Sequence, residues 1–255
     1  MNSHLRSEAI YKALLKDGAL RLSELAQRLS VSMPTIRKDV DEMAQAQRVE
    51  RSRGMVRLRQ GVSFMSDGTG SSHLRNNAEK ARIGQKAAAL VGNGESIILD
   101  CGATTTEMAK NLASREGLRV VTSALNIAMI LGAEPSNRIM LPGGLFKPET
   151  ISLSGEKTST FFEGMFADKL FLAAGGVAMD VGLSYPDFID LHIKRAMIEA
   201  ANRVYLVCES SKFGKRDFAA FGAIDEVDVL ITDRGLEPRF VEWLTQQDVE
   251  IIYAD

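Results

Sequence analysis

Beyond residue 77 the chain alternates short apolar segments, each as long as a β-strand, with amphipathic segments of helix length. The expected strands are residues 95–100, 119–122, 138–141, 169–173, 203–207, 227–232 and 249–253. The expected helices are residues 77–91, 105–112, 125–131, 154–165, 188–201 and 237–246. Such alternation predicts an α/β domain whose mostly parallel sheet is covered by helices on both faces. Because ligands of such sheets bind at the carboxyl ends of the strands, the loops that follow the strands are the candidate site.

The segment 61–77 separates this region from a smaller one with a different pattern. It is rich in glycine and serine, can bury little apolar surface, and is typical of a linker or an exposed loop. We therefore expect a small domain over residues 1–60, a linker over 61–77 and the α/β domain over 78–255. No apolar run approaches the roughly 20 residues that cross a bilayer, and the N-terminus lacks a signal-peptide pattern. A cytoplasmic protein with no membrane partner is expected.

The small region has the order of elements found in a winged helix-turn-helix domain. Apolar residues at helical spacing predict a first helix that stops at Gly18. A second short helix and a tight turn follow, and a third helix begins near Met33, with Pro34 tolerated in its first turn. Residues 48–59 alternate in hydrophobicity around Ser52-Arg53-Gly54, which favours a β-hairpin.

The charge of the chain is unevenly distributed. Residues 1–60 hold twelve Lys/Arg and seven Asp/Glu, a net charge of +5, whereas the rest carries −7. A basic domain in front of an acidic one suits a domain that meets a polyanion. The two cysteines, Cys101 and Cys208, and the three histidines are scattered, which favours free thiols over a disulfide or a metal motif. We assign no metal ligand, no cofactor and no catalytic residue.

Double-stranded operator DNA is the polyanion that this layout suits, because a helix fits the major groove and its first turns reach the base edges. The candidates for contact with base edges are Met33, Pro34, Thr35 and Lys38. The candidates for contact with phosphates are Ser32, Arg37, Arg48, Arg51, Arg53 and Arg57. The alternative is a helical hairpin for dimerisation whose charges are merely solvated.

Four loops that follow expected strands carry small, hydroxylated or basic residues. Such residues between a strand and a helix N-terminus can hold a phosphate group. The residues concerned are Asp100, Gly102, Ala103, Thr104, Thr105 and Thr106, then Ser123 and Asn126, then Gly143, Gly144 and Lys147, and finally Lys212. Each loop alone also fits an ordinary turn with a solvated lysine. Convergence at one edge of one sheet is the stronger indication.

The helix-turn-helix segment resembles that of DeoR-family transcription regulators. The resemblance rests on Leu22-Ser-Glu-Leu-Ala26 and on Val31-Ser-Met-Pro-Thr-Ile-Arg-Lys-Asp39, whose second half is close to the Thr-Ile-Arg-[Arg/Lys]-Asp-Leu segment of the family. The hairpin departs from the family pattern Arg-Thr-His-Gly-Gly, because it reads Arg51-Ser52-Arg53-Gly54-Met55. The resemblance implies a wing that still binds phosphate with an altered contact pattern.

The resemblance continues over the larger region, which is similar to the sensor domain of the same family. It is carried by Arg75, Lys80, the Asp-x-Gly-x-Thr motif of residues 100–104, Gly143-Gly144, Gly182-Leu183, Lys194-Arg195-Ala196 and Ser211-Lys212-Phe213-Gly214. It implies a fold similar to ribose-5-phosphate isomerase, with phosphate at Gly102 and Thr104–Thr106 and with Lys194, Gly175 and Lys212 near the effector. Family members are usually dimers or larger, so a homo-oligomer, a dimer or a tetramer, is implied.

Three departures fall where the sugar would be recognised. Lys147 stands where many members carry Arg, which keeps the charge and loses the bidentate fork. The segment Ala173-Ala174-Gly175-Gly176 lacks the Asp of the family loop, and Tyr185-Pro186-Asp187 replaces Asn-Glu. We expect a transcription regulator, a repressor of a carbohydrate-catabolism operon, controlled by a phosphorylated sugar. The alternative is a sugar-phosphate isomerase-like enzyme with a nucleic-acid anchor, for which Asp100, Asp187 and Glu209 are candidate bases.

Overall fold

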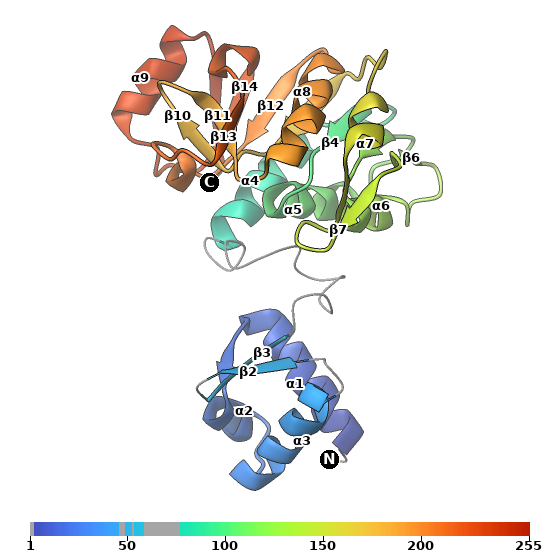
Figure 1. Cartoon of the computed structure of the whole chain (residues 1–255), viewed down its shortest axis with the longest axis vertical. Helices are drawn as coiled ribbons and strands as arrows, with labels where there is room; N and C mark the ends of the chain where they lie inside the picture. The colour runs from blue at the N-terminus through green and yellow to red at the C-terminus, as the bar shows by residue number, and fades with distance from the viewer. Residues whose placement is uncertain (1–2, 46–48, 53, 59–76) are drawn as a thin grey trace. The chain divides into compact units, whose positions relative to one another are not determined.

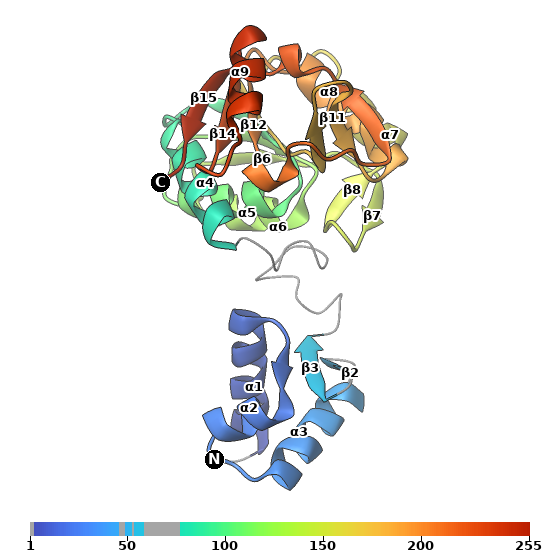
Figure 2. The same ribbon diagram turned by 90° about the vertical axis from the view of Figure 1, so that its left-hand side faces the viewer.

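The computed structural model describes residues 3–45, 49–52, 54–58 and 77–255. The chain divides into two compact units, Met1–Leu74 and Arg75–Asp255 (Figures 1 and 2). The linker expected over residues 61–77 lies, apart from Asn77, outside the described residues, and its bounds stay a prediction. Within the described residues, no helix is both long enough and apolar enough to span a membrane.

The first unit is a winged helix-turn-helix, as predicted. Three helices, α1 (Ser3–Asp17), α2 (Leu22–Arg28) and α3 (Met33–Gln45), are followed by the hairpin of β2 (Val49–Ser52) and β3 (Met55–Leu58). Gly18 ends α1 in the left-handed region (φ 73°), where a residue with a Cβ would be strained. A strand that the sequence did not predict, β1 (Leu20–Arg21), pairs with β3 and completes an antiparallel sheet of order β1-β3-β2.

One small core holds this unit together. Its buried side chains come from all three helices and both hairpin strands, and they are Ile10, Leu14, Leu20, Leu22, Leu25, Ala26, Ile36, Val40, Met43, Val49 and Val56. The spacing of Ile36, Val40 and Met43 places them on one side of α3. The opposite side of α3 therefore faces away from the core.

The second unit is built on a parallel sheet of seven strands with the order β15-β14-β12-β9-β4-β5-β6. The strands are β4 (Ser96–Leu99), β5 (Arg119–Thr122), β6 (Arg138–Met140), β9 (Lys169–Leu172), β12 (Val204–Val207), β14 (Val229–Thr232) and β15 (Glu250–Tyr253). From β4 the chain first adds β5 and β6 on one side and later adds β9, β12, β14 and β15 on the other. The topological switch point therefore lies between β4 and β9, where ligands of such sheets bind.

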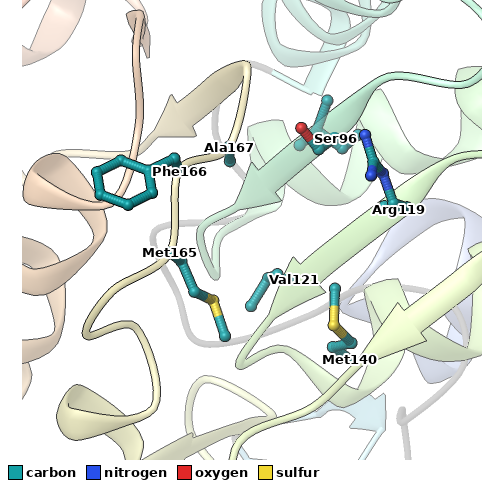
Figure 3. Close-up of a pocket in the computed structure, with 8 residues that line it drawn as sticks. Ser96, Arg119, Val121, Met140, Met165, Phe166 and Ala167 are labelled. Atoms are coloured by element: carbon teal, nitrogen blue, oxygen red, sulfur yellow. The ribbon is translucent and has the colours of Figure 1, made fainter.

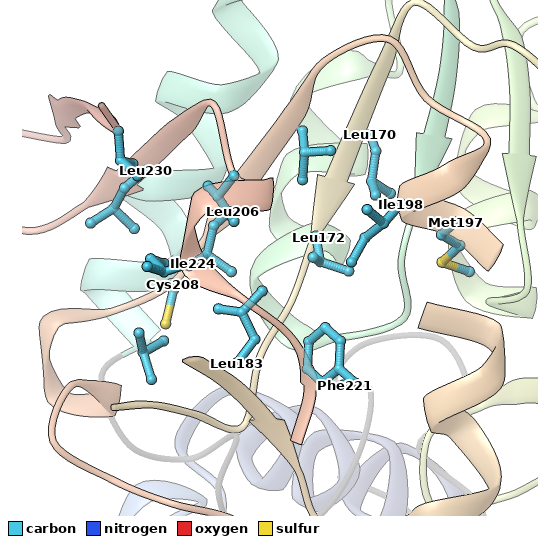
Figure 4. Packing of buried hydrophobic residues seen from close by; sticks show 14 of the residues in the cluster. Leu170, Leu172, Leu183, Met197, Ile198, Leu206, Cys208, Phe221, Ile224 and Leu230 are labelled. Atoms are coloured by element: carbon cyan, nitrogen blue, oxygen red, sulfur yellow. The ribbon is translucent and has the colours of Figure 1, made fainter. Parts of the chain in front are cut away.

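Helices cover one face of this sheet and a mixed layer covers the other. On the first face lie α4 (Asn77–Ala89), α5 (Ala103–Leu112) and α6 (Leu125–Leu131), drawn cyan to green in Figure 1. The other face packs against α8 (Leu191–Glu199), α9 (Pro238–Gln246) and a small antiparallel sheet of order β10-β11-β13. Figure 4 shows Leu170 and Leu172 of β9 in one cluster with Leu183, Met197 and Phe221 of the layer on this face. The predicted α/β fold class is thus confirmed.

Several elements of the second unit differ from the prediction. The helix expected over residues 154–165 is only α7 (Glu156–Thr160). The strand β8 (Ser152–Ser154) precedes it, and Gly155 between them has a φ of 100°, which is not helical. The sequence also did not predict β7 (Leu145–Lys147), β8, β10 (Gly176–Ala178), β11 (Gly182–Tyr185) or β13 (Ala219–Gly222). The helix expected over 188–201 begins as a 3₁₀ turn, η1 (Phe188–Asp190), and two more such turns are η2 (Ser210–Lys212) and η3 (Ile224–Glu226).

Candidate DNA-reading surface and effector site

The exposed side of α3 carries the residues that were predicted to reach DNA. Arg37 and Lys38 are exposed, and the Lys38 side chain retains 78% of its accessible surface. Ser32 and Pro34 are exposed at the start of the helix, whereas Met33 is half-buried. The first turn of α3 can therefore present side chains to a base edge, which is what a reading helix requires.

Ser32 and Thr35 interact with each other at this end of α3. The Ser32 Oγ lies 2.8 Å from Thr35 Oγ1 and accepts a hydrogen bond from the Thr35 amide at 3.4 Å. A serine hydroxyl that accepts from a first-turn amide caps the helix. The hydroxyl predicted to hold a DNA phosphate therefore also stabilises the helix start.

Asp39, the last residue of the helix-turn-helix motif, faces the interior. It is 1% exposed, and its carboxylate accepts two hydrogen bonds from the Arg6 guanidinium, at 2.6 Å from Nε and 3.0 Å from Nη2. This bidentate pair joins α1 to α3 and fixes the angle at which α3 leaves the core. No role for Asp39 was predicted from the sequence.

The wing arginines pair with acidic residues on the surface. Arg57 forms an ion pair with Glu50 across the hairpin at 2.7 Å, and Arg51 pairs with Asp41 of α3. Exposed ion pairs contribute at most about 1 kcal/mol, so a DNA phosphate can replace the carboxylate at little cost. Arg48 and Arg53 lie outside the described residues, and their predicted phosphate contacts stay a prediction.

In the second unit, the loop between β4 and α5 lies at the switch point. Gly102 is the N-cap of α5, and its carbonyl accepts hydrogen bonds from Thr105 Oγ1 at 3.0 Å and from Thr106 Oγ1 at 2.6 Å. Thr104, Thr105 and Thr106 are all buried. The hydroxyls of Thr105 and Thr106 therefore bind their own helix. The amides of Ala103, Thr104 and Thr105 are left as donors for an anion, because first-turn amides lack a partner within the helix.

Asp100 and Lys194 form a buried ion pair beneath this loop. The Lys194 ammonium lies 2.5 Å from Asp100 Oδ2 and donates to the Ala173 carbonyl at 2.8 Å, and both charged side chains are 2% exposed. Asp100 also accepts from the amides of Cys101 at 2.8 Å and Ala173 at 2.9 Å. The pair ties the ends of β4 and β9 to α8. Both residues were predicted to bind effector, and in the structure they bond to the backbone of Cys101 and Ala173.

A second lysine of the predicted site is surrounded by carboxylates. Lys147, in β7, donates hydrogen bonds to Asp187 and, at 2.6 Å, to Asp190 Oδ2, while Ser154 Oγ donates to Asp190 Oδ1 at 2.6 Å. Burial lowers the pKa of Lys147, but the hydrogen bonds to the two aspartates outweigh it and raise the pKa above its ordinary value. The bond from Lys147 and the amide of Ile189 lower the pKa of Asp187.

Asp190 was not among the predicted residues, although the sequence held a signal for it. Asp187 and Asp190 are three residues apart, a spacing that brings two side chains to the same side of a helical turn. Asp187 caps that turn, η1, by accepting from the Ile189 amide at 3.0 Å. Only the tertiary structure brings Lys147 to them.

Asn126, Ser123 and the Gly143-Gly144 pair surround the same loop edge. Asn126 Nδ2 donates to Thr106 Oγ1 at 2.9 Å, which joins the loops that follow β4 and β5. The carbonyl of the buried Ser123 accepts from the Leu153 amide at 2.8 Å and so binds β8 alongside. Gly144 has a φ of 153°, and a Cβ there would overlap Thr158 Oγ1 and the Ser154 carbonyl. Gly144 is therefore required for packing against α7.

Gly175 and Lys212 belong to two neighbouring loops. A Cβ on Gly175 would overlap the Asp217 carboxylate, so the absence of a side chain lets two loops approach closely. Lys212 is half-buried in η2, and within the described ranges its ammonium forms no ion pair. Beside it, Lys80 of α4 forms a buried ion pair with Glu209 at 2.5 Å.

Cys101 and Tyr185 complete the buried part of the site. The Tyr185 ring lies 4.1 Å from the Lys194 ammonium, and burial raises the pKa of the Cys101 thiol to about 12. A thiol with such a pKa is protonated at neutral pH and is a poor nucleophile. Within the described ranges, no three His, Cys, Asp or Glu side chains are grouped so that they could bind a metal ion.

The three candidate bases for an isomerase are all paired with lysines. Asp100 pairs with Lys194, Asp187 with Lys147, and Glu209 with Lys80. For Asp187, the hydrogen bond from Lys147 lowers the pKa of the carboxyl and so makes it a weaker base. The arrangement suits binding better than proton transfer.

A groove of about 230 Å³ lies along β4, β5 and β6. Its lining includes Ser96 at the start of β4 and Arg119 at the start of β5, together with Met140, Met165 and Phe166 (Figure 3). None of the predicted effector residues lines this groove.

Together, a winged helix with an exposed basic reading helix and an α/β unit with a polar switch-point site define a DNA-binding regulator with a sensor domain. Comparison with known proteins gives the family. Residues 6–61 match the DeoR-like helix-turn-helix domain, and residues 75–234 match the DeoR C-terminal sensor domain. The chain belongs to the DeoR family of transcriptional regulators.

The relatives of the chain include named repressors. The chain is 30% identical to the glycerol-3-phosphate regulon repressor of Escherichia coli, over 98% of this chain and 99% of the relative. It is 32% identical to the lactose phosphotransferase system repressor of Streptococcus mutans, over 91% and 93%. Ribose 5-phosphate isomerase A from Neisseria gonorrhoeae superimposes with a TM-score of 0.41 at 13% identity over 55% of each chain. The family match makes the chain a regulator of transcription and disfavours the enzyme alternative.

Proposed function

We propose that the protein represses a carbohydrate-catabolism operon and releases its operator when a phosphorylated sugar binds the second unit. The observation that carries the proposal is the gathering of Gly102, Asn126 and Lys147 around the carboxyl ends of β4 and β5, beside the switch point. Thr106 bonds to both Gly102 and Asn126, and Lys147 pairs in register with Ser152, which bridges to Ala124 after β5. The amides at the start of α5 suit a phosphate group, and the relatives named above are repressors of glycerol-phosphate and lactose systems.

Coupling between the two ligands requires the sugar phosphate to bind the operator-bound and free states unequally. We further propose that the regulator acts in the cytoplasm as a homo-oligomer, because helix-turn-helix dimers read half-sites about 34 Å apart or multiples of that. Sedimentation equilibrium of the full chain tests the oligomeric state. A monomer at the concentration that saturates operator would contradict the proposed homo-oligomer.

A thermal-shift screen of the full chain tests the effector class. Sugar phosphates are compared with the matching free sugars, and a ligand at a hundred times its Kd stabilises the native state by about 2.7 kcal/mol. The expected result is a shift with a phosphorylated sugar, no shift with the free sugar, and a loss of operator affinity with the same compound. A chain that binds operator and responds to none of the phosphorylated sugars would contradict the proposal.

A further inference from the structure

Lys147 was predicted to hold the phosphate of the effector, but its surroundings are electrostatically unsuited to an anion. One ammonium is shared by two carboxylates, those of Asp187 and Asp190, so the three groups carry a net charge of −1. Asp187 is ionised at neutral pH, because its pKa is held below the ordinary value. A phosphate dianion that approached Lys147 would meet two like charges at short range.

The same groups match the hydroxyls of a sugar. A hydroxyl donates one hydrogen bond and accepts others, so it can donate to a carboxylate and accept from an ammonium at the same time. Asp187 and Lys147 are neighbours with opposite hydrogen-bonding capacity, and the Asp187 side chain is 39% exposed. Asp190, 8% exposed and bonded to Ser154 at 2.6 Å, holds the Lys147 ammonium in place from the interior.

The cluster also borders the proposed phosphate loop. The hairpin strand β8, which carries Ser154, pairs with the loop after β5 through the Leu153 amide and the Ser123 carbonyl at 2.8 Å. That loop is joined to Thr106 of α5 by Asn126 at 2.9 Å. A ligand bound at the start of α5 therefore has the Lys147 cluster beside it.

We propose that Lys147 and Asp187, supported by Asp190, form a subsite that binds hydroxyl groups of the effector, while its phosphate is held at the start of α5. The proposal rests on the proposed function and specifies the ligand as a phosphorylated polyhydroxy compound with free hydroxyls away from the phosphate. Asp187 is then a specificity-determining residue.

Titration calorimetry of the full chain tests the subsite with ribose 5-phosphate, fructose 6-phosphate, glycerol 3-phosphate and inorganic phosphate. The variant is Asp187→Asn, which keeps the size of the side chain and removes its charge. The matched control is Asp180→Asn, which removes the same charge from an exposed ion pair with Arg216 in the same unit. The quantity compared is the ratio of the Kd for an organic phosphate to the Kd for inorganic phosphate.

For the organic phosphate that binds wild type most tightly, we expect this ratio to rise about tenfold or more in Asp187→Asn, the size of a lost hydrogen bond to a charged group. The control ratio should change less than twofold. Tighter binding of inorganic and organic phosphate by the same factor would mean that Asp187 only competes with phosphate for Lys147, and would overturn the subsite.

A second measurement does not depend on the folding of any variant. Wild type is titrated with 2-deoxyribose 5-phosphate and with ribose 5-phosphate, and with 1-deoxyfructose 6-phosphate and fructose 6-phosphate. At least one deoxy compound should bind about tenfold more weakly than its parent, and equal affinities within both pairs would overturn the subsite. If no phosphate compound binds wild type while operator binding is intact, the proposed effector class fails, and the subsite fails with it.

Discussion

The two units of this regulator use charged side chains in opposite ways. In the DNA-reading unit the described basic residues that are candidate DNA contacts lie on the surface, as Lys38 does, or form exposed pairs, as Arg57 does with Glu50. Arg6, which pairs with the buried Asp39, is not among these candidates. In the sensor unit Lys194 and Lys80 are buried against carboxylates, those of Asp100 and Glu209. A surface for a polyanion needs cations that can exchange partners, whereas a site for a small ligand needs loops held in fixed positions.

The largest effect is expected where a buried pair is broken. Lys194→Met leaves Asp100 buried without its counter-ion, which typically costs about 3–5 kcal/mol of unfolding free energy. Urea denaturation of the full chain, followed in the sensor unit by near-UV circular dichroism, measures the change. The matched control is Lys169→Met. The Lys169 side chain is 18% exposed and pairs with Glu95, so this variant should lose less unfolding free energy.

The double variant Asp100→Asn/Lys194→Met removes both charges and should recover part of the stability lost in Lys194→Met. If Lys194→Met cost no more than Lys169→Met, the claim that the fully buried pair is the one that stabilises the sensor unit would be wrong.

In the DNA-reading unit, a surface lysine should affect binding and not stability. Lys38→Ala is expected to weaken operator binding about tenfold, because a base contact contributes about 1–3 kcal/mol, while the unfolding free energy changes by less than about 0.5 kcal/mol. Fluorescence anisotropy with operator DNA measures the affinity. Lys110→Ala, an exposed lysine of the sensor unit, is the control. Unchanged affinity in Lys38→Ala would show that the reading helix has been placed wrongly.

The wing arginines should act through salt dependence. Arg57→Gln is expected to reduce the slope of log K against log salt concentration by about 1, because one phosphate contact is lost. The control Arg28→Gln removes the same charge from an exposed pair with Asp17, outside the predicted contacts. Equal slopes for Arg57→Gln and wild type would remove Arg57 from the DNA surface.

The smallest effect is expected from pH, in the sensor unit. Hydrogen bonds from the Ser96 hydroxyl and amide lower the pKa of Asp168. The folded pKa is below the unfolded value of about 3.9, so this stabilisation is complete above about pH 4 and is lost as pH falls through the folded pKa. In denaturation curves from pH 6 to pH 2, the unfolding free energy of Asp168→Asn should fall less steeply with decreasing pH than that of wild type. Parallel profiles for the variant and wild type would contradict the assignment.

The local order of the fold followed from the sequence. Hydrophobic period and glycine positions predicted the helix-turn-helix, the wing and the strands of the main sheet, because those signals act within one element. The same reasoning placed the residues 100–106 between a strand and a helix N-terminus. The helix expected over 154–165 is shortened to α7 (Glu156–Thr160), because Ser154 still belongs to the antiparallel hairpin β7–β8, whose pairing is not visible in a local period.

What the tertiary structure alone decided is the partner of each charged side chain. Lys194 and Asp100 are 94 residues apart in sequence, and Lys147 and Asp190 are 43 apart. Lys147, Asp187 and Lys194 were candidates from the sequence. The sequence could not show that Lys147 and Asp187 form an ion pair or that Lys194 is buried. Such contacts depend on the strand order of the sheet and on how the hairpin packs against it, and they arise only when the whole core forms.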